Sequence, residues 1–260
     1  MHPQGILFDL DGVLYNAGQP ITGAAQTVAW VREQRIPHLF VTNTTSRPRS
    51  ALVEKLAQFG IGTEESRICT PAIAAVSWLQ SQPRGDVTLF VRPTARIDFQ
   101  GLALLPDNAE EGASYVVVGD LGDAWDYRTL NRAFRLLHHN PAATLVALGM
   151  TRYWLSPDGV SLDVAPFVVA LEHATGRKAV VLGKPAQPFF EAAVRELGLS
   201  AAETVMIGDD VKADVGGAQA AGLQGVLVKT GKFHPKDLAG DVHPDGVIDS
   251  IADLPAWWDR

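Results

Sequence analysis

Two aspartates, two positions apart, follow an apolar run near the start of the chain. Asp9 ends the run at residues 5–8, and Asp11 comes just before a turn at Gly12. The run is typical of a strand buried on both faces, and side chains two apart on a strand point the same way. Two carboxylates facing one cavity repel each other, so one stays protonated unless a cation joins them. The spacing therefore indicates either a metal site or an acid/base pair.

Polar residues also follow three other apolar runs. Thr42 and Asn43 stand at the end of the run at 38–42, and Lys184 follows the run at 179–182. Asp209 follows the run at 204–208, with Asp214 a short distance further on. In an open parallel sheet, ligands bind beyond the carboxyl ends of the strands. All four segments end there, so we expect them to converge on one site.

The elements that must position these residues alternate between strands and helices. Helical spacing is clear at Leu52, Leu56 and Phe59 and again at residues 189–197, each closed by a glycine. Helices between β-rich runs predict an α/β fold, in which a Rossmann-like parallel sheet carries helices on both faces. The predicted strands span residues 5–9, 38–42, 67–70, 87–91, 115–119, 144–148, 179–182, 204–208, 225–228 and 246–248.

A composition shift at residues 83–86 interrupts this alternation, and residues 174–178 read as a helix end before the next strand. The segment between them has strands, helices and polar loops of its own. We therefore predict that residues 83–177 form an inserted, smaller α/β cap domain, and that residues 1–82 and 178–260 form the core domain. The alternative is one continuous sheet.

Composition limits the classes of function. The chain has 260 residues, of which 47% are hydrophobic, and a net charge of −7, which disfavours nucleic acid and anionic membrane as partners. No apolar stretch approaches the roughly 18 residues of a membrane span, and no signal peptide is apparent. The single cysteine, Cys69, suits a reducing cytoplasm and is read as a buried apolar residue rather than a nucleophile.

The chemistry that suits these segments is phosphoryl transfer. A carboxylate such as Asp9 can attack phosphorus and form an aspartyl-phosphate, which brings two anions together. Mg²⁺ bound by oxygen ligands would neutralise both, and Asp9 and Asp209 can share it with water and the Leu10 or Asp11 carbonyl. Asp11 can donate a proton to the leaving oxygen and then accept one from water.

The phosphate oxygens need donors as well. Thr42 and nearby backbone N–H groups can hold them, and Lys184 offers a point charge to the same oxygens or to Asp9. Each segment alone has a structural explanation, such as a helix cap, a solvated turn or a capping loop. Their occurrence in this order, each after a strand, makes coincidence a poor explanation.

These motifs resemble the haloacid dehalogenase superfamily of phosphatases, over nearly the whole chain. The resemblance is carried by residues 9–12, 42–43, 184–185 and 208–214, and it is closest to the subfamily with an α/β cap inserted between the second and third of these segments. It implies that Asp9 is the nucleophile, Asp11 the general acid/base and Lys184 the residue that orients Asp9 and phosphate. It further implies phosphate binding by Thr42 and Asn43, metal binding by Asp9, Asp11 and Asp209, and bracing of the metal shell by Asp214.

The expected substrate is a small phosphorylated metabolite or pyrophosphate. Caps of this kind close over the site, and Tyr153 and Trp154 can either stack on an organic leaving group or pack within the cap. Relatives often dimerise through the cap, so a homodimer is a further expectation, with Trp125 or Trp154 as contact candidates.

The sequence is also compatible with two rival functions. One is a phosphate- or nucleotide-binding regulatory module without turnover, although the chain lacks Gly-x-Gly-x-x-Gly after its first strand and a Walker lysine loop. The other is a phosphotransferase or dehalogenase on the same fold. The retention of Asp11 and Asp209 disfavours a dehalogenase, which needs neither a metal nor a second aspartate.

Overall fold

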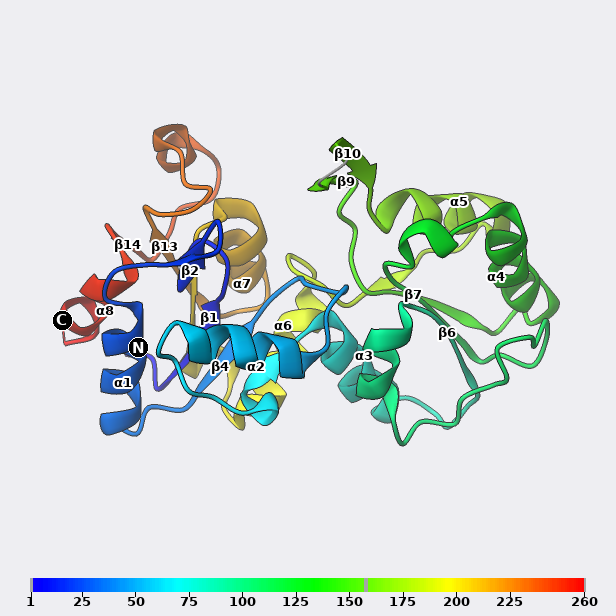
Figure 1. The fold of residues 1–260 in the computed structure, drawn as a ribbon, viewed down its shortest axis with the longest axis horizontal. Coiled ribbons are helices and arrows are strands. Elements are labelled where there is room, and N and C mark those ends of the chain that lie inside the picture. The colour runs from blue at the N-terminus through cyan, green and yellow to red at the C-terminus, as the bar shows by residue number, and fades with distance from the viewer. Residues whose placement is uncertain (1, 157–158, 260) are drawn as a thin grey trace. The chain divides into compact units, whose positions relative to one another are not determined.

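The computed structural model describes residues 2–156 and 159–259, and the side chains of residues 154–156 lie outside the description. The chain divides into two compact units, each with its own hydrophobic core (Figure 1). The second unit is the mainly green part of Figure 1 and contains Asn43–Pro48 and Thr70–Gly183. The first unit contains Met1–Thr42, Arg49–Cys69 and Lys184–Arg260.

A parallel sheet with the strand order β14-β13-β12-β1-β4-β5 forms the centre of the first unit. β1 lies in the interior of this sheet, and its residues Ile6, Leu7 and Phe8 are fully buried. The chain winds outward from β1 on one side and from β12 on the other, so the order reverses between these two strands. The strands are β1 (Gly5–Asp9), β4 (His38–Val41), β5 (Ile68–Cys69), β12 (Thr204–Gly208), β13 (Gln224–Val228) and β14 (Gly246–Ile248).

Helices connect these strands, as the apolar spacing predicts. In α6, Phe189, Phe190 and Val194 are buried, and Gly198 ends the helix in the left-handed conformation. A short antiparallel hairpin, β2 (Tyr15–Asn16) with β3 (Gln19–Pro20), follows β1. The helices of this unit are α1 (Ala24–Glu33), α2 (Arg49–Gln58), α6 (Gln187–Leu197), α7 (Gly217–Ala220) and α8 (Leu254–Trp258).

The second unit is built on a smaller parallel sheet with the order β11-β8-β7-β6. Its core includes a stack in which the Trp125 ring lies 5.8 Å from that of Phe90 and 4.6 Å from that of Phe167. Trp125 is thus half-buried within its own unit. The elements are β6 (Val87–Phe90), β7 (Tyr115–Val118), β8 (Thr144–Ala147), β11 (Val180–Val181), the antiparallel pair β9 (Tyr153–Ser156) and β10 (Gly159–Leu162), and helices α3 (Pro71–Gln80), α4 (Tyr127–His139) and α5 (Ala165–Thr175).

The predicted α/β fold with parallel sheets is confirmed, and an observed strand lies within or beside every predicted one. The two hairpins, β2–β3 and β9–β10, were not predicted. The second compact unit is longer than residues 83–177, because α3 packs on the 93–99 turn and β11 pairs with β8. The core and cap boundaries at 82/83 and 177/178 stay a prediction.

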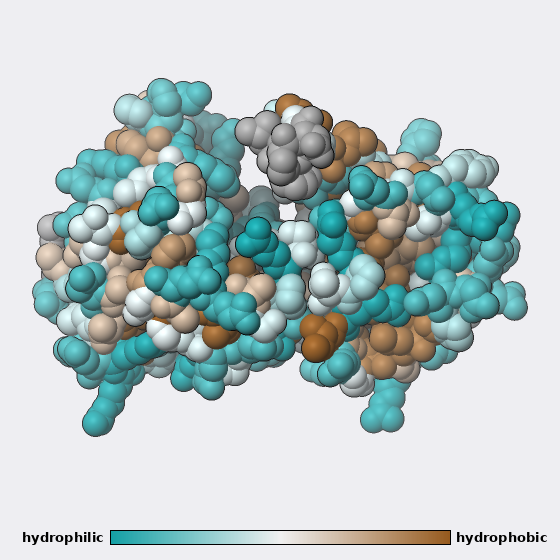
Figure 2. Space-filling view, viewed as in Figure 1, coloured by the Kyte–Doolittle hydropathy of each residue, from teal (hydrophilic) through white to brown (hydrophobic). Residues whose placement is uncertain are grey.

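The surface is mainly polar where Figure 2 shows it, with apolar side chains in small groups. Exposed apolar residues occur on β9 and β10, where Tyr153 is 56% and Val160 73% exposed. The Trp154 side chain lies outside the described residues. None of the described helices combines the length and apolar character needed to cross a bilayer.

Cys69 is buried at the end of β5, as expected for a structural cysteine. Burial raises the pKa of its thiol to about 12, and only the thiolate reacts with alkylating reagents. Native protein should therefore react with iodoacetamide near neutral pH roughly 10³-fold more slowly than denatured protein. Mass spectrometry measures the rate, and Cys69→Ser is the blank. Rapid labelling of the native protein would contradict the burial.

Candidate active site

The candidate site begins at the point where the strand order of the first sheet reverses. Asp9 is the last residue of β1, and Asp209 directly follows the neighbouring strand β12. Residues Phe8 and Ile207 are register partners, so both carboxylates leave the same edge of the sheet. Asp9 is 7% and Asp209 1% exposed. The reversal of strand order is where open α/β sheets bind ligands.

Lys184 joins this pair from a third segment. Its Nζ lies 2.6 Å from Asp9 Oδ1 and 2.7 Å from Asp214 Oδ1. Lys184 and Asp214 are both buried. One ammonium group therefore bridges two carboxylates that are separated by about 200 positions in the sequence, at a site from which water is largely excluded.

Asp214 is held by the segment that follows β12. Residues Val211–Gly216 form a π-helical turn, an irregularity that is frequent at functional sites. Asp210 begins the turn, and its Oδ1 accepts hydrogen bonds from the N–H groups of Lys212 and Ala213. The Asp210 N–H in turn donates to Asp214 Oδ2 at 3.1 Å. Asp210 is thus the cap of the turn, which leaves the adjacent Asp209 available to the site.

The two oxygens of Asp209 have different environments. Oδ2 accepts the backbone N–H of Lys232 at 2.7 Å. Oδ1 is buried and has no hydrogen-bond donor among the described residues. Oxygens of Asp9, Asp209 and Asp214 all lie within 4.8 Å of one another. Carboxylate oxygens are the ligands that Mg²⁺ prefers, so this donor set fits the ion and Asp209 Oδ1 offers an open position.

The pKa shifts of the buried groups agree with a cation site at these carboxylates. Burial, with the neighbouring acids Asp214 and Asp209, raises the pKa of Asp9 to about 7 against the opposing effect of Lys184. Burial and Asp214 raise the pKa of Asp209 to about 6. Burial disfavours the charged form of Lys184, but Asp214 and Asp9 outweigh it and raise the pKa of that ammonium. Three acids and one base are buried together, so a further cation would relieve their repulsion.

The other predicted residues lie near the ends of β1 and β4. Thr42 is buried directly after β4, and its N–H donates to the Cys69 carbonyl. Asp11 is exposed in the turn after β1. In that turn the Leu10 carbonyl accepts the N–H of Leu14 at 2.9 Å, which leaves the Asp11 carbonyl as the better of the two metal-ligand candidates.

The structure thus brings together Asp9, Lys184, Asp209 and Asp214. Asn43 is exposed and belongs to the second unit, so its role in phosphate binding stays a prediction. The loop after β13, where Lys232 contacts Asp209, was not predicted from the sequence. A signal was present: like the four predicted segments, residues 229–232 directly follow an apolar run.

Comparisons with known proteins agree with the motifs. Sequence profiles described as haloacid dehalogenase-like hydrolase and HAD-hydrolase-like match residues 6–103 and 181–254. The human phospholysine phosphohistidine inorganic pyrophosphate phosphatase is 36% identical over 96% of this chain and 92% of its own length. The chain belongs to the haloacid dehalogenase-like hydrolases. The resemblance found in the motifs is therefore confirmed.

Further relatives extend this likeness. The Bos taurus haloacid dehalogenase-like hydrolase domain-containing protein 2 is 40% identical over 90% of this chain and 87% of its own length. Among solved structures, the p-nitrophenyl phosphatase from Archaeoglobus fulgidus has a TM-score of 0.87 and 26% identity, covering 99% of this chain and 100% of that one. The haloacid dehalogenase fold therefore spans nearly the whole chain.

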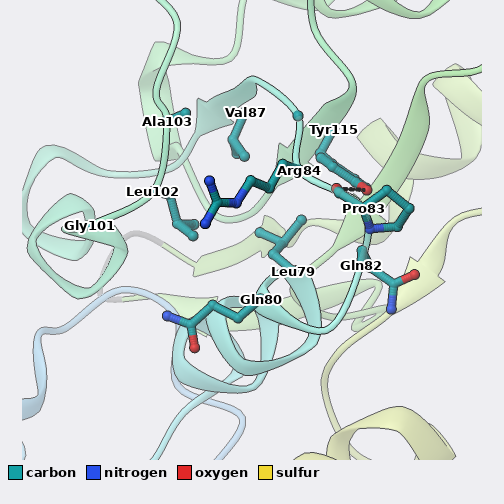
Figure 3. A pocket seen from close by; sticks show the side chains of 11 residues that line it. Leu79, Gln80, Gln82, Pro83, Arg84, Val87, Gly101, Leu102, Ala103 and Tyr115 are labelled. Atoms are coloured by element: carbon teal, nitrogen blue, oxygen red, sulfur yellow. Dashed lines mark hydrogen bonds between the residues drawn. The ribbon is translucent and has the colours of Figure 1, made fainter.

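A cavity of about 460 Å³ in the second unit is a separate feature (Figure 3). It lies between the end of α3 and the start of β6, and the Arg84 side chain extends across it. The Tyr115 hydroxyl is engaged, since it donates to the Pro83 carbonyl at 2.8 Å. No acid is among the described lining residues, so this cavity has no part in the carboxylate cluster.

Replacing the buried lysine tests the charge arrangement. Lys184→Met removes the counterion of two buried acids, and breaking a buried pair costs about 3–5 kcal/mol of unfolding free energy. Lys229→Met is the matched control, because Lys229 pairs with the exposed Asp249 in the same unit and such surface pairs contribute about 0–1 kcal/mol. Denaturant unfolding of metal-free protein measures both. Equal losses in the two variants would contradict a buried, charged Lys184.

Proposed function

We propose that the chain is a Mg²⁺-dependent phosphatase that works through an aspartyl-phosphate on Asp9. The observation that carries the proposal is the buried cluster of Asp9, Asp209 and Asp214 around Lys184, with one Asp209 oxygen left without a donor. Phosphatase names among the relatives support the same reaction class.

Asp9 and Asp209 would hold the metal, together with the backbone carbonyl of Asp11. Asp214 would support the metal site indirectly, because its ion pair with Lys184 holds the lysine in place. When bound, Mg²⁺ neutralises charge on the phosphate and on the carboxylates, which allows an anionic nucleophile to approach an anionic phosphoryl group. Thr42 and Asn43 would bind phosphate oxygens, and Lys184 would hold Asp9 Oδ1 in a fixed orientation.

The first half-reaction forms a bond between an Asp9 carboxylate oxygen and phosphorus and breaks the bond from phosphorus to the leaving oxygen. Asp11 gives its proton to that oxygen. In the second half-reaction water attacks phosphorus and gives a proton to Asp11, and the bond from phosphorus to the Asp9 oxygen breaks. Phosphate leaves, and Asp9 and Asp11 return to their starting states. Exposure of Asp11 suits a group that must reach the leaving oxygen and water in turn.

The substrate is proposed to be a small phosphorylated metabolite or pyrophosphate. One relative is named for phospholysine, phosphohistidine and inorganic pyrophosphate, and another is named a p-nitrophenyl phosphatase. A cytoplasmic location and a homodimer formed through the cap are part of the same proposal. A phosphatase screen across sugar phosphates, nucleotides, pyridoxal phosphate, pyrophosphate and phosphoamino acids would identify the leaving group.

Replacing the nucleophile tests the mechanism directly. Asp9→Asn keeps the shape of the side chain but removes the attacking carboxylate, so Mg²⁺-dependent phosphate release from p-nitrophenyl phosphate should fall by roughly 10³-fold or more. Asp249→Asn makes the same change at an exposed acid and should keep the wild-type rate. Full activity of Asp9→Asn would refute Asp9 as the nucleophile. No release by the wild-type enzyme would favour a binding module without turnover.

Replacing the general acid should lower the rate of hydrolysis by a factor that depends on the leaving group of the substrate. Asp11→Asn should slow hydrolysis of an alkyl phosphate by about 10²–10⁴-fold, since its poor leaving group needs a proton. The loss should be smaller with p-nitrophenyl phosphate, whose leaving phenolate is stable without one. Steady-state kinetics on both substrates compare the two losses. Equal losses would indicate that Asp11 does not protonate the leaving oxygen.

A further inference from the structure

The loop after β13 closes on the candidate metal site through two hydrogen bonds. The Thr230 hydroxyl donates to the Gly12 carbonyl, which lies in the turn that follows Asp9. The Lys232 N–H donates to Asp209 Oδ2 at 2.7 Å. Residues 230–232 therefore connect the end of β13 to both acid-bearing segments. We call these residues the 230–232 clamp.

Gly231 allows this close approach. Its backbone has a φ of +61°, in the left-handed region that favours glycine. A Cβ at this position would lie 2.1 Å from Asp209 Oδ2 and 2.5 Å from the Gly12 Cα. Neither neighbour is the free end of a flexible side chain. Any larger residue must therefore displace the Asp209 carboxylate or the turn at Gly12.

The two oxygens of Asp209 have different roles: one accepts a hydrogen bond from the clamp, and the other is available to a cation. The clamp fixes Oδ2, and Oδ1 is left buried beside Asp9 and Asp214 without a donor in the described part of the chain. A carboxylate held through one oxygen loses little further freedom when its other oxygen binds a cation. Groups that orient a metal ligand in this way affect the affinity for the metal without touching it.

We infer that the 230–232 clamp positions Asp209 for the divalent cation and that Thr230 and Gly231 are positioning residues of this enzyme. The inference rests on the metal site of the proposed function and deepens it. The hydrogen bond of the clamp to Asp209 comes from the Lys232 backbone N–H and not from its side chain. That side chain is 70% exposed and lies 3.5 Å from Asp210 Oδ2, on the capping residue rather than on Asp209.

The test measures the affinity of the full chain for Mn²⁺ in the absence of substrate, with electron paramagnetic resonance as the readout of binding. Gly231→Ala should weaken Mn²⁺ binding by about 10-fold or more, the size expected when a group that orients a metal ligand is lost. Gly198→Ala is the matched control, because Gly198 also has a positive φ, of +75°, but no atom lies within 4 Å of the added Cβ. It carries the same backbone strain and should keep wild-type affinity.

Substitutions of Thr230 provide a second test that changes the backbone less than Gly231→Ala does. Thr230→Val removes the hydroxyl that binds the Gly12 carbonyl, whereas Thr230→Ser keeps it. Valine should weaken Mn²⁺ binding and serine should restore it. In kinetics with p-nitrophenyl phosphate, the Mg²⁺ concentration for half-maximal activity should rise, while kcat at saturating Mg²⁺ stays near the wild-type value.

The outcomes separate the clamp from the proposed function. Wild-type Mn²⁺ affinity in Gly231→Ala would overturn the clamp and leave the phosphatase proposal intact. Weakened binding in Gly231→Ala, with no phosphate release by the wild-type protein, would support the clamp and overturn the phosphatase proposal. Equal weakening in Gly231→Ala and Gly198→Ala would assign the effect to backbone strain and also overturn the clamp.

Discussion

The arrangement of buried charge around Lys184 is the constraint on which the rest of the site depends. Its ammonium bridges Asp9 and Asp214, and Asp209 lies within reach of both acids. The cluster contains more negative than positive charge in a buried region, and burial, reinforced by Asp214 and Asp209 against the opposing effect of Lys184, raises the pKa of Asp9 to about 7. A fold built only for stability has little reason to bury such a cluster, because desolvated charges cost more than well-packed apolar residues.

The sheet explains why these residues can meet. The strand order reverses between β1 and β12, so the segments that follow these strands separate and leave room at their carboxyl ends. Asp9 and Asp209 stand at that opening. Lys184 is the residue at which the chain returns to the first unit, whose last segment is Lys184–Arg260. The strand that precedes it, β11, pairs with β8 in the sheet of the second unit. The lysine therefore sits where the chain passes from one sheet to the other.

Sequence alone predicts the parts that leave a pattern. β1 and β12 are fully buried apolar runs, and the polar residues after them stand out. The β2–β3 hairpin leaves little pattern because each of its strands has only two residues, and β10 has no buried face to mark it, because its apolar residues Val160 and Leu162 are exposed. The 230–232 clamp was missed for another reason: its contact with Asp209 comes from a backbone N–H, and residue type does not show which residue's N–H will reach that carboxylate. The placement of Asn43 needs the two units located relative to each other, which residue spacing does not provide.

The adjacent aspartates at 209 and 210 show why geometry must complete the sequence argument. A pair of aspartates before a helix-like segment predicts one capping residue and one functional residue without saying which is which. Asp210 accepts the N–H groups at the start of the π-helical turn, and its own N–H holds Asp214 Oδ2. The cap therefore also fixes the carboxylate that pairs with Lys184. Loss of the Asp210 side chain would loosen the turn and, through Asp214, the lysine that orients Asp9.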